Sequence, residues 1–501
     1  MLSSMWSNRV LWLCGCLFVS TAQSRPNFII MQPDDFEFLT NWNAPAHVRR
    51  SNGYTMADRL LPNINRLRTD GLTMERAYTA SPVCGPSRFS TLTGRYASRS
   101  AYGREEAGNR ADFTFVDIPE SKMLDVDGVN DCTDTSIPVL MQRNGYKTGF
   151  MGKWHVGLSA NNRNGLRNYD AQREAIQNCG FDVAEAISWD NIAEGDGYLH
   201  NLEHLADEAL KFIDDAVDAN QEFYMYFNPT APHANGNVLE SLTEFTCRDA
   251  PEGRLAREPV IPGMTQGVGC EAYRQTILDR ADGDTSNQML GNIWVDDTVG
   301  ALLQKLEDVG QLDNTFFLFQ LDHGQEGKGT LYEPGVRIAQ FIHYPDEIRR
   351  GSTFSGLVST IDIGPTVADY AGITTRSRGW YDMDGESWKS RFERNNPGDR
   401  CVVSELEEDR TVVCECEKVL QINTSNSNTQ SRSRRFGTAR EGNLQLCDNR
   451  GNYITSPAST PEANNAANSA GYNQLDTILD CHNDATHPNQ TPRYGACDYS
   501  I

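Results

Sequence analysis

The sequence has no long apolar run beyond its first 24 residues, and it carries little positive charge. Lysine and arginine together number 45 against 68 aspartates and glutamates, which gives a formal net charge of −23 at pH 7. Nucleic-acid binding needs a basic surface, so this balance argues against that class of function. A membrane span needs about 20 consecutive apolar residues. No stretch after residue 24 approaches that length, so we expect no membrane span.

The first 24 residues have the pattern of a secretory signal. Arg9 supplies the positive charge, Val10–Val19 forms the apolar core, and residues 20–24 offer the small side chains of a cleavage site. The segment Leu13–Cys16 fits a lipid-attachment site as an alternative, but the apolar stretch continues past Cys16. We therefore expect an exported protein, secreted or held in the lumen of the secretory or lysosomal pathway.

The 13 cysteines fit an oxidising compartment. Two of them leave with the signal and Cys84 belongs to a motif discussed below. The others fall into two groups, one before residue 300 and one after residue 400: Cys132, Cys179, Cys247 and Cys270, then Cys401, Cys414, Cys416, Cys447, Cys481 and Cys497. Both groups are even in number, which fits disulfides confined to each region, although the connectivity cannot be read from spacing. Asn423 and Asn489 begin acceptor triplets for N-linked glycans, if the secretory route is eukaryotic.

Four short apolar runs each end in polar residues capable of chemistry. The runs and their polar ends are 27–31 with Asp34 and Asp35, 148–151 with Lys153 and His155, 223–227 with His233, and 316–321 with Asp322 and His323. Continuous apolar runs of this length are typical of strands buried on both faces. Ligands of open α/β sheets bind beyond the carboxyl ends of such strands. The pattern therefore predicts an α/β domain in which four strand ends meet at one cleft.

Helical segments alternate with these runs, and the pattern changes near the C-terminus. Residues 293–309 carry an apolar stripe at helical spacing that ends at Gly310. After residue 385, the short β-type segments at 402–403, 411–413 and 418–420 indicate an antiparallel sheet. We therefore divide the chain into a signal peptide at 1–24, a large α/β domain at 25–385, and a smaller domain at 386–501 with a polar loop and a disulfide-bearing tail.

The segment Cys84-Gly85-Pro86-Ser87-Arg88, followed by Leu92-Thr93-Gly94-Arg95, resembles the signature of the formylglycine-dependent sulfatase family, part of the alkaline phosphatase superfamily. A cysteine on its own in a secreted protein is more often half of a disulfide, but the second motif at the expected offset favours the resemblance. Pro86 and Ser87 also indicate a helix opening, which places Cys84 near the positive end of a helix dipole. Over residues 26–390 the resemblance implies a large mixed, mostly parallel sheet flanked by helices, followed by a small antiparallel sheet.

The same resemblance implies hydrolysis of sulfate esters and a role for each matching residue. Cys84 would be converted to Cα-formylglycine by a formylglycine-generating enzyme, and the hydrate of that aldehyde would attack sulfur. Arg88 would hold the hydrate, and Lys153 and Lys328 would contact the sulfate. His155 would act as the base that assists release of sulfate, and His233 would contact sulfate or protonate the departing oxygen.

Asp34, Asp35, Asp322 and His323 fall where the family binds one divalent cation, usually Ca²⁺. Three carboxylates suit a hard, oxygen-seeking ion that polarises the ester oxygens. Many members have asparagine at the position of His323, so the histidine leaves the identity of the metal open.

The sequence leaves the substrate open between a sulfated small molecule and a sulfated carbohydrate. The net negative charge weighs against a polysulfated polymer, because repulsion slows encounter. Two alternatives remain. One is a phosphonate monoester or phosphodiester hydrolase of the same superfamily, because sulfate and phosphate esters share tetrahedral geometry. The other is a secreted binding protein without catalysis, in which Cys84 stays a thiol.

Overall fold

The structure is a computed structural model, and it describes most of the chain. The described residues are 25–36, 60–99, 136–156, 165–192, 198–234, 237–375, 383–398, 400–406, 409–415, 417–422, 439–445, 478 and 481. The predicted signal peptide, both glycan triplets and the polar loop after residue 422 lie outside these residues.

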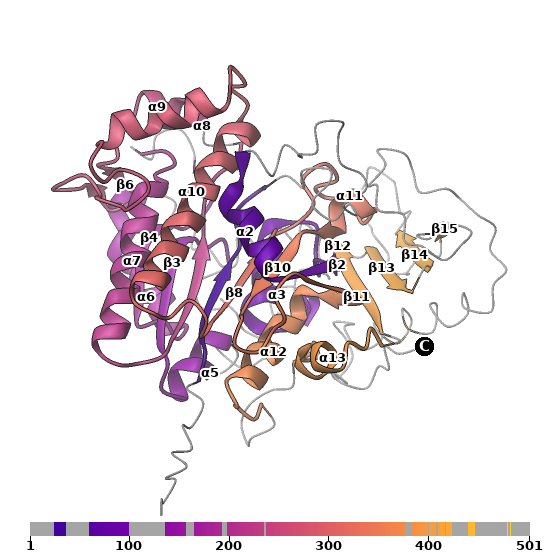
Figure 1. Ribbon diagram of the computed structural model, residues 1–501. Coiled ribbons are helices and arrows are strands. Elements are labelled where there is room, and N and C mark those ends of the chain that lie inside the picture. The colour runs from indigo at the N-terminus through magenta and orange to yellow at the C-terminus, as the bar shows by residue number, and fades with distance from the viewer. Residues whose placement is uncertain are drawn as a thin grey trace, which may run out of the picture.

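The core of the molecule is a nine-stranded mixed sheet (Figure 1). Its strands, in spatial order, are β11 (Ser352–Ser359), β2 (Leu72–Tyr78), β10 (Gln340–His343), β8 (Thr315–Gln320), β1 (Asn27–Met31), β5 (Phe223–Asn228), β3 (Lys147–Lys153) and β4 (Val183–Ser188), with β9 (Arg337–Ile338) paired to β2. Neighbours run parallel from β8 to β4, and β11 is parallel to β2. β10 is antiparallel to both of its neighbours. The predicted mixed, mostly parallel sheet is confirmed.

The four apolar runs of the sequence form four adjacent strands, β8, β1, β5 and β3. Every residue of β1, β5 and β8 is buried, as expected for strands that are covered on both faces. Their register places Ile29 between Met225 and Phe317. Because the four strands are parallel, their carboxyl ends lie at the same edge of the sheet.

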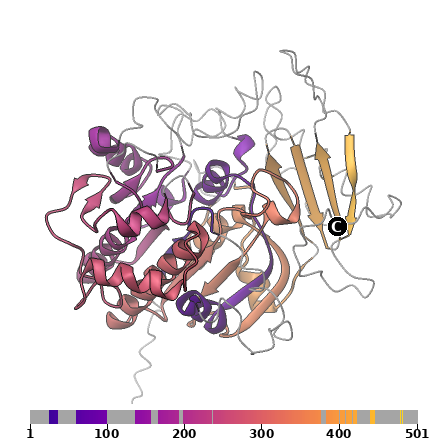
Figure 2. The same cartoon turned by 90° about the horizontal axis from the view of Figure 1, so that it is seen from above.

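Helices lie on both sides of the sheet (Figure 2). They are α2 (Pro62–Asp70), α3 (Cys84–Thr93), η2 (Ala97–Arg99), α5 (Ile137–Arg143), α6 (Gly165–Asn178), α7 (Leu202–Asp218), α8 (Val238–Thr243), α9 (Cys270–Arg280), α10 (Asn287–Asp308), α11 (Glu333–Val336), η5 (Thr360–Asp362), α12 (Ile363–Tyr370) and α13 (Lys389–Arg394). α10 packs against α7 and α2, and α3 packs against α5, α12 and η5. The predicted helix at 293–309 is the C-terminal part of α10, which ends at Asp308. Gly310, just beyond it, has a φ of 68°, a conformation that favours glycine after a helix. None of the described helices has both the length and the apolar content of a membrane span.

A small antiparallel sheet lies beside the β2–β11 end of the central sheet (Figure 1). Its strands are β12 (Cys401–Leu406), β13 (Asp409–Cys414), β14 (Glu417–Ile422) and β15 (Ala439–Gln445). The predicted strands near 402, 411 and 418 lie in β12, β13 and β14, so this part of the predicted fold is confirmed as well. A separate two-stranded ribbon pairs β6 (Asp249–Ala250) with β7 (Gly253–Arg254).

The small sheet is bonded to the loop that precedes Cys84. The Ser404 hydroxyl donates to the backbone oxygen of Thr79 at 2.6 Å. The backbone N–H of Glu405 donates to the backbone oxygen of Ala80 at 2.8 Å. Through β12, the C-terminal part of the chain therefore helps to fix the segment between β2 and α3.

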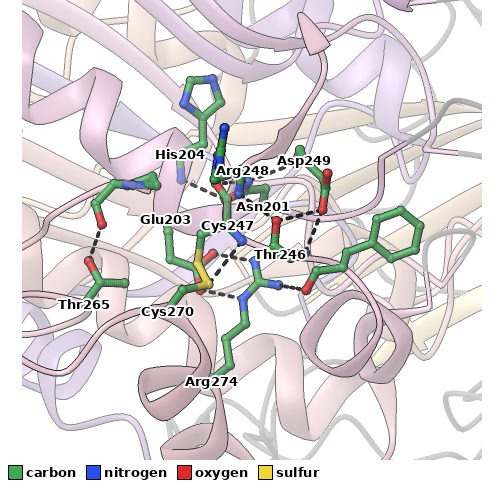
Figure 3. Close-up of a disulfide and its surroundings, with 12 residues drawn as sticks. Asn201, Glu203, His204, Thr246, Cys247, Arg248, Asp249, Thr265, Cys270 and Arg274 are labelled. Carbon is green, nitrogen blue, oxygen red and sulfur yellow. Dashed lines mark hydrogen bonds and ion pairs between the residues drawn. A yellow bond between two sulfur atoms is a disulfide. The ribbon is translucent and has the colours of Figure 1, made fainter. Parts of the chain in front are cut away.

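A disulfide between Cys247 and Cys270 anchors the region of α8 and α9 (Figure 3). Beside it, Arg274 donates to both carboxylate oxygens of Glu203 in α7, at 2.9 Å each. Both side chains are buried, and the paired geometry offsets the cost of removing two charges from water. A second disulfide joins Cys401 to Cys414. One bridge lies before residue 300 and the other after residue 400, which confirms the expected regional pairing for these two.

His343 in β10 is a buried histidine whose protonation should destabilise the fold in acid. Its pKa is lowered to about 4, chiefly by burial and further by Arg350 and Arg66, while Asp70 and Asp313 act in the opposite direction. The unfolded chain, with the ordinary histidine pKa of about 6.5, takes up this proton first as the pH falls. Between pH 6.5 and 4 the folded state therefore loses up to about 3 kcal/mol of its free energy of unfolding.

We expect His343→Gln to lose less stability than the wild type between about pH 7.5 and about pH 4.5, because glutamine does not titrate. Midpoints of urea unfolding at the two pH values measure the difference. At the higher pH both side chains are neutral, so the gap between the two proteins there reports packing alone. An equal acid-induced drop in both proteins would show that His343 contributes nothing to the pH dependence.

Candidate active site

Four strand ends and one helix N-terminus meet at the carboxyl edge of the central sheet. Asp34 and Asp35 follow β1, His155 follows β3, His233 follows β5, and Asp322 and His323 follow β8. Lys153 is the last residue of β3, Cys84 is the first residue of α3, and Arg88 lies one turn further along that helix. Lys328 reaches Asp35 from the loop before α11. The structure thus brings the predicted site residues together at one edge.

Cys84 begins a helix whose every residue is buried. Among the described cysteines it alone is free, and its side chain is 2% exposed. Its sulfur lies 3.3 Å from Nε2 of His323 and 3.8 Å from Oδ1 of Asp35. Burial raises the pKa of this thiol, chiefly because a thiolate loses its hydration there. The unmodified side chain is therefore protonated, which is unfavourable for a nucleophile.

Four donor atoms form a compact group around His323. They come from Asp35, Cys84, Asp322 and His323, and all lie within 4.8 Å of one another. Nε2 of His323 is 3.1 Å from Oδ1 of Asp35 and 3.5 Å from Oδ2 of Asp322. In the described structure, Oδ2 of Asp322 is buried without a hydrogen-bond partner. A buried carboxylate oxygen without a donor fits a position that binds a cation, and two carboxylates supply the oxygen ligands that such an ion prefers.

Asp34 lies outside the group of four donor atoms. Its two carboxylate oxygens instead accept hydrogen bonds from two cationic side chains. Arg88 donates to Oδ1 at 3.1 Å and Lys153 donates to Oδ2 at 2.5 Å. Arg88 is 0% exposed, and its guanidinium also lies 3.8 Å from Oδ2 of Asp322. Of the four predicted cation ligands, Asp35, Asp322 and His323 therefore lie together in this structure. The fourth, Asp34, is instead paired with Arg88 and Lys153.

The charges in the group shift one another's pKa values. Burial acts to raise the pKa of the Asp35 carboxyl, but the hydrogen bond and charge of His323 hold it below its ordinary value. Burial raises the pKa of Asp322. Burial opposes a charge on His323, yet Asp322 and Cys84 raise its pKa well above the ordinary value. The carboxylates of Asp35 and Asp322 therefore hold a positive charge on His323 beside them. A place that attracts positive charge in this way supports a cation site here.

Lys328 adds a further cation at the same place. Its Nζ lies 2.6 Å from Oδ1 of Asp35. Burial acts to lower the pKa of Lys328, but Cys84 and Asp35 raise it above the ordinary value. Together with Lys153 and Arg88, it gives the site three positive charges, which favour the binding of an anion.

Two histidines of the site are held neutral. Burial is the main cause that keeps the pKa of His155 well below its ordinary value, and Lys153 adds to it. Burial also lowers the pKa of His233 to about 4, and its Nε2 lies 3.5 Å from Oδ2 of Asp35. His155 and Asp35 both adopt positive φ angles, 51° and 56°. Non-glycine residues in this conformation cost about 1–3 kcal/mol and cluster at functional sites.

Asp190 and Asn191 complete the site, although the sequence patterns above do not single them out. Oδ1 of Asp190 lies 3.2 Å from Nε2 of His155. Oδ1 of Asn191 accepts a hydrogen bond from Lys153. Both follow β4, just as the other polar clusters follow their strands. β4 reads Val-Ala-Glu-Ala-Ile-Ser, without the continuous apolar run that marked the other strands, so its polar end was missed.

His200, also not predicted, holds the loop that carries His233. Its Nε2 lies 3.3 Å from the backbone oxygen of His233, and its Nδ1 lies 2.9 Å from the Thr230 hydroxyl. A carbonyl oxygen only accepts, so Nε2 carries the hydrogen and, in the neutral ring, the hydroxyl donates to Nδ1. His200 is buried, and these two bonds fix the backbone next to His233.

The part of the chain that contains this site resembles known proteins. The protein-family model described as Sulfatase matches residues 26–373. The chain is 24% identical over 441 residues to an N-acetylglucosamine-6-O-sulfatase of Bacteroides thetaiotaomicron, an alignment that covers 74% of this chain and 71% of that protein. It is 24% identical over 394 residues to a human N-acetylgalactosamine-6-sulfatase, covering 72% of this chain and 64% of the human protein.

A solved structure shares the fold across most of the molecule. The PsFucS1 sulfatase from Pseudoalteromonas sp. superposes with a TM-score of 0.59 at 20% identity, covering 93% of this chain and 92% of that one. At this level of identity the match concerns the fold alone.

Proposed function

Because this chain belongs to the sulfatase family of the alkaline phosphatase superfamily, we propose that it hydrolyses sulfate esters through a formylglycine made from Cys84. The observation that carries the proposal is the position of Cys84. This free, buried cysteine begins α3 beside two carboxylates and among three cationic side chains. A sulfate ester would meet a helix N-terminus and fixed positive charges there, both of which favour an anion.

The cationic side chains orient the ester in this proposal. Lys153 and Lys328 neutralise sulfate oxygens, and each is already held by a carboxylate, Asp34 or Asp35. Arg88 stays in place through its bond to Asp34 and balances the charge of the carboxylates. Because these groups are buried and fixed, their interactions strengthen as charge develops without reorganisation of solvent.

The two neutral histidines carry the protons. His233 gives a proton to the leaving oxygen, and His155 accepts one when sulfate is released. The pKa of His233 is about 4, so its imidazole is neutral at pH 7 when no substrate is bound. It therefore gains its proton as the anionic ester binds. Asp190, 3.2 Å from Nε2 of His155, stabilises the charge that His155 acquires.

We propose that Asp34, Asp35, Asp322 and His323 hold one divalent cation, with Ca²⁺ as the expected ion. Bound there, it would polarise the oxygens of the ester. The donor set fits, because Asp322 offers a buried oxygen without a hydrogen-bond partner and the group already attracts positive charge.

Mass spectrometry of the tryptic peptide Ala77–Arg88, from protein made in its native host, tests the nucleophile. We expect an aldehyde in place of the thiol at Cys84. The same preparation is then assayed with an aryl sulfate, an aryl phosphate monoester and an aryl phosphodiester, with and without added Ca²⁺. Sulfate cleavage should be the fastest. A disulfide at Cys84 would refute the nucleophile, and faster phosphodiester cleavage would replace sulfate ester hydrolysis by the alternative activity.

We propose further that the physiological substrate is a sulfated carbohydrate and that the protein is exported through the signal at 1–24. The relatives named above are sulfatases of N-acetylglucosamine and N-acetylgalactosamine 6-sulfate groups by their names, which supports a sugar substrate. kcat/KM on a panel of sulfated monosaccharides should exceed that on an aryl sulfate. N-terminal sequencing of protein recovered from the medium tests export.

Asn191→Ala is expected to lower kcat/KM for sulfate esters about 10-fold. Without the amide oxygen of Asn191, Lys153 keeps only Asp34 as a partner in this set, so its ammonium group is held less rigidly. Hydrogen bonds to charged groups contribute about 1.5–3 kcal/mol, and about 1.4 kcal/mol corresponds to a factor of ten. Steady-state kinetics on one sulfate ester measures the change.

Asn65→Ala is the matched control, because Asn65 also accepts from a charged side chain, Arg68, in the remote helix α2. It should leave kcat/KM unchanged. Equal kinetics for Asn191→Ala and the wild type would show that Asn191 does not position Lys153.

A further inference from the structure

The Cys84 thiol belongs to a group of four donor atoms with the spacing of a small metal site. The sulfur lies 3.3 Å from Nε2 of His323, which in turn is 3.1 Å from an oxygen of Asp35 and 3.5 Å from an oxygen of Asp322. Around zinc, bonds of about 2.0–2.3 Å in a tetrahedron place neighbouring donors roughly 3.3–3.6 Å apart. Four separations within this group, including 3.8 Å from the sulfur to Asp35, run from 3.1 to 3.8 Å, and all four donors lie within 4.8 Å of one another.

The imidazole of His323 is oriented as a ligand. Its Nδ1 lies 3.3 Å from the backbone oxygen of Gly324. That oxygen only accepts, so Nδ1 carries a hydrogen. Nε2 faces Asp35, Cys84 and Asp322, and its own hydrogen, which it donates to Asp35 in this structure, would be replaced by a bound metal ion. A backbone carbonyl on the far ring nitrogen is the usual partner that fixes a metal-binding histidine.

An independent feature also indicates a cation at this place. Oδ2 of Asp322 is buried and accepts no hydrogen bond in the described structure, and its cationic neighbours, Nε2 of His323 and the Arg88 guanidinium, lie 3.5 and 3.8 Å away. Buried carboxylate oxygens are nearly always paired with a donor or an ion. Lys328, 2.6 Å from Asp35, and Arg88, 3.8 Å from Asp322, offset the negative charge that a thiolate would add.

We propose that the unmodified chain binds one Zn²⁺, or a similar borderline divalent ion, through Cys84, His323, Asp35 and Asp322. A thiol that coordinates a metal ion releases its proton to solvent as the metal–sulfur bond forms, so the protonated thiol of Cys84 does not prevent binding. Thiolate and imidazole select Zn²⁺ over Ca²⁺, which prefers six to eight oxygen ligands.

Conversion of Cys84 to formylglycine would remove the sulfur and leave a set of donors dominated by oxygen. The same pocket then changes its metal preference from a borderline ion to a hard one. Modification at Cys84 would in this way determine the metal as well as the nucleophile. Conversely, a chain in which Cys84 remains a thiol would bind a borderline ion such as Zn²⁺ in place of Ca²⁺.

Cobalt titration of the thiol form tests this. Untagged full-length protein is made in cells without a formylglycine-generating activity, and the thiol at Cys84 is verified by mass. Added Co²⁺ should give a sulfur-to-cobalt charge-transfer band and tetrahedral ligand-field bands that saturate at one equivalent. Zn²⁺ should abolish both bands, and an excess of Ca²⁺ should not.

Cys84→Ser is the matched variant, and it also controls for cysteines elsewhere in the chain. It should lose the charge-transfer band and bind Zn²⁺ at least about 100-fold more weakly, since loss of an outer partner alone costs about 10–100-fold. In wild-type thiol protein, which needs no substitution to fold, Zn²⁺ should raise the thermal midpoint and Ca²⁺ should not.

A cobalt spectrum without the sulfur band, the same band in Cys84→Ser, or displacement by Ca²⁺ would each overturn the inference. These readouts do not involve ester turnover. Their failure would leave the proposed sulfate ester hydrolysis intact, and failure of the hydrolase assays would leave the zinc site untouched.

Discussion

Replacing Cys84 with serine is expected to abolish multiple turnover and to leave a single transfer of the sulfuryl group. The serine hydroxyl oxygen bonds to sulfur as its proton passes to the carboxylate of Asp35, the acceptor of the Cys84 thiol in this structure. The bond from sulfur to the alcohol oxygen breaks, and His233 protonates that oxygen. The product is a serine sulfate. A formylglycine hydrate would carry a second hydroxyl on the same carbon, whose deprotonation expels sulfate, whereas serine has none.

Turnover should therefore fall by at least about 10⁴-fold, the scale seen when a nucleophile is removed. Rapid-mixing kinetics should show a burst of about one equivalent of alcohol, and the intact mass should rise by one sulfuryl group. Cys84→Ala is the control, with neither burst nor added mass. Sustained turnover by Cys84→Ser would contradict the formylglycine mechanism.

Removal of the positive charge at Arg88 is expected to reduce both activity and stability. Its guanidinium, fully buried, donates to Asp34 at 3.1 Å and lies 3.8 Å from Asp322. Arg88→Met leaves these carboxylates with less compensation. Breaking a buried ion pair costs about 3–5 kcal/mol. Loss of a fixed charge at the reacting group costs about 10²–10³ in kcat.

Arg274→Met separates the two effects. Arg274 is also buried and ion-paired, through two hydrogen bonds to Glu203, but it lies beside the Cys247–Cys270 disulfide rather than in the site. Arg274→Met should lower the free energy of unfolding about as much as Arg88→Met does. The molecules that remain folded should keep the wild-type kcat. Denaturation and kinetics on both variants measure this. Equal kcat losses in the two variants would mean that Arg88 acts only through folding.

The central strands could be predicted because burial on both faces leaves a direct trace in the sequence. β1, β5 and β8 are apolar at nearly every position, and each is followed by a group with chemical function. Since parallel strands place such groups at one edge, most of the site followed from the chain alone. In β4 the apolar residues are interrupted by Glu185, so no continuous apolar run marks the strand or the polar end that carries Asp190 and Asn191.

Other features depend on contacts that no local pattern records. β10 runs antiparallel between β8 and β2, and nothing in Gln340–His343 specifies that direction. The pairing of Asp34 with Arg88 and Lys153, rather than with the other carboxylates, depends on positions in three dimensions. Disulfide connectivity likewise cannot be read from local sequence. The number of cysteines in each region limits the possible pairs, but only the fold brings two particular sulfurs together.

The bond from Ser404 to Thr79 joins residues 325 positions apart in the chain. A ribosome adds about 5–20 residues per second, so roughly 15–65 seconds pass between synthesis of the two ends of that contact. Throughout this interval the segment that leads into Cys84 lacks its final support from β12. If Cys84 is modified as proposed above, synthesis order would give the modifying enzyme a period of access to a side chain that is only 2% exposed once folding is complete. The late position of β12 in the chain would then delay the final burial of Cys84.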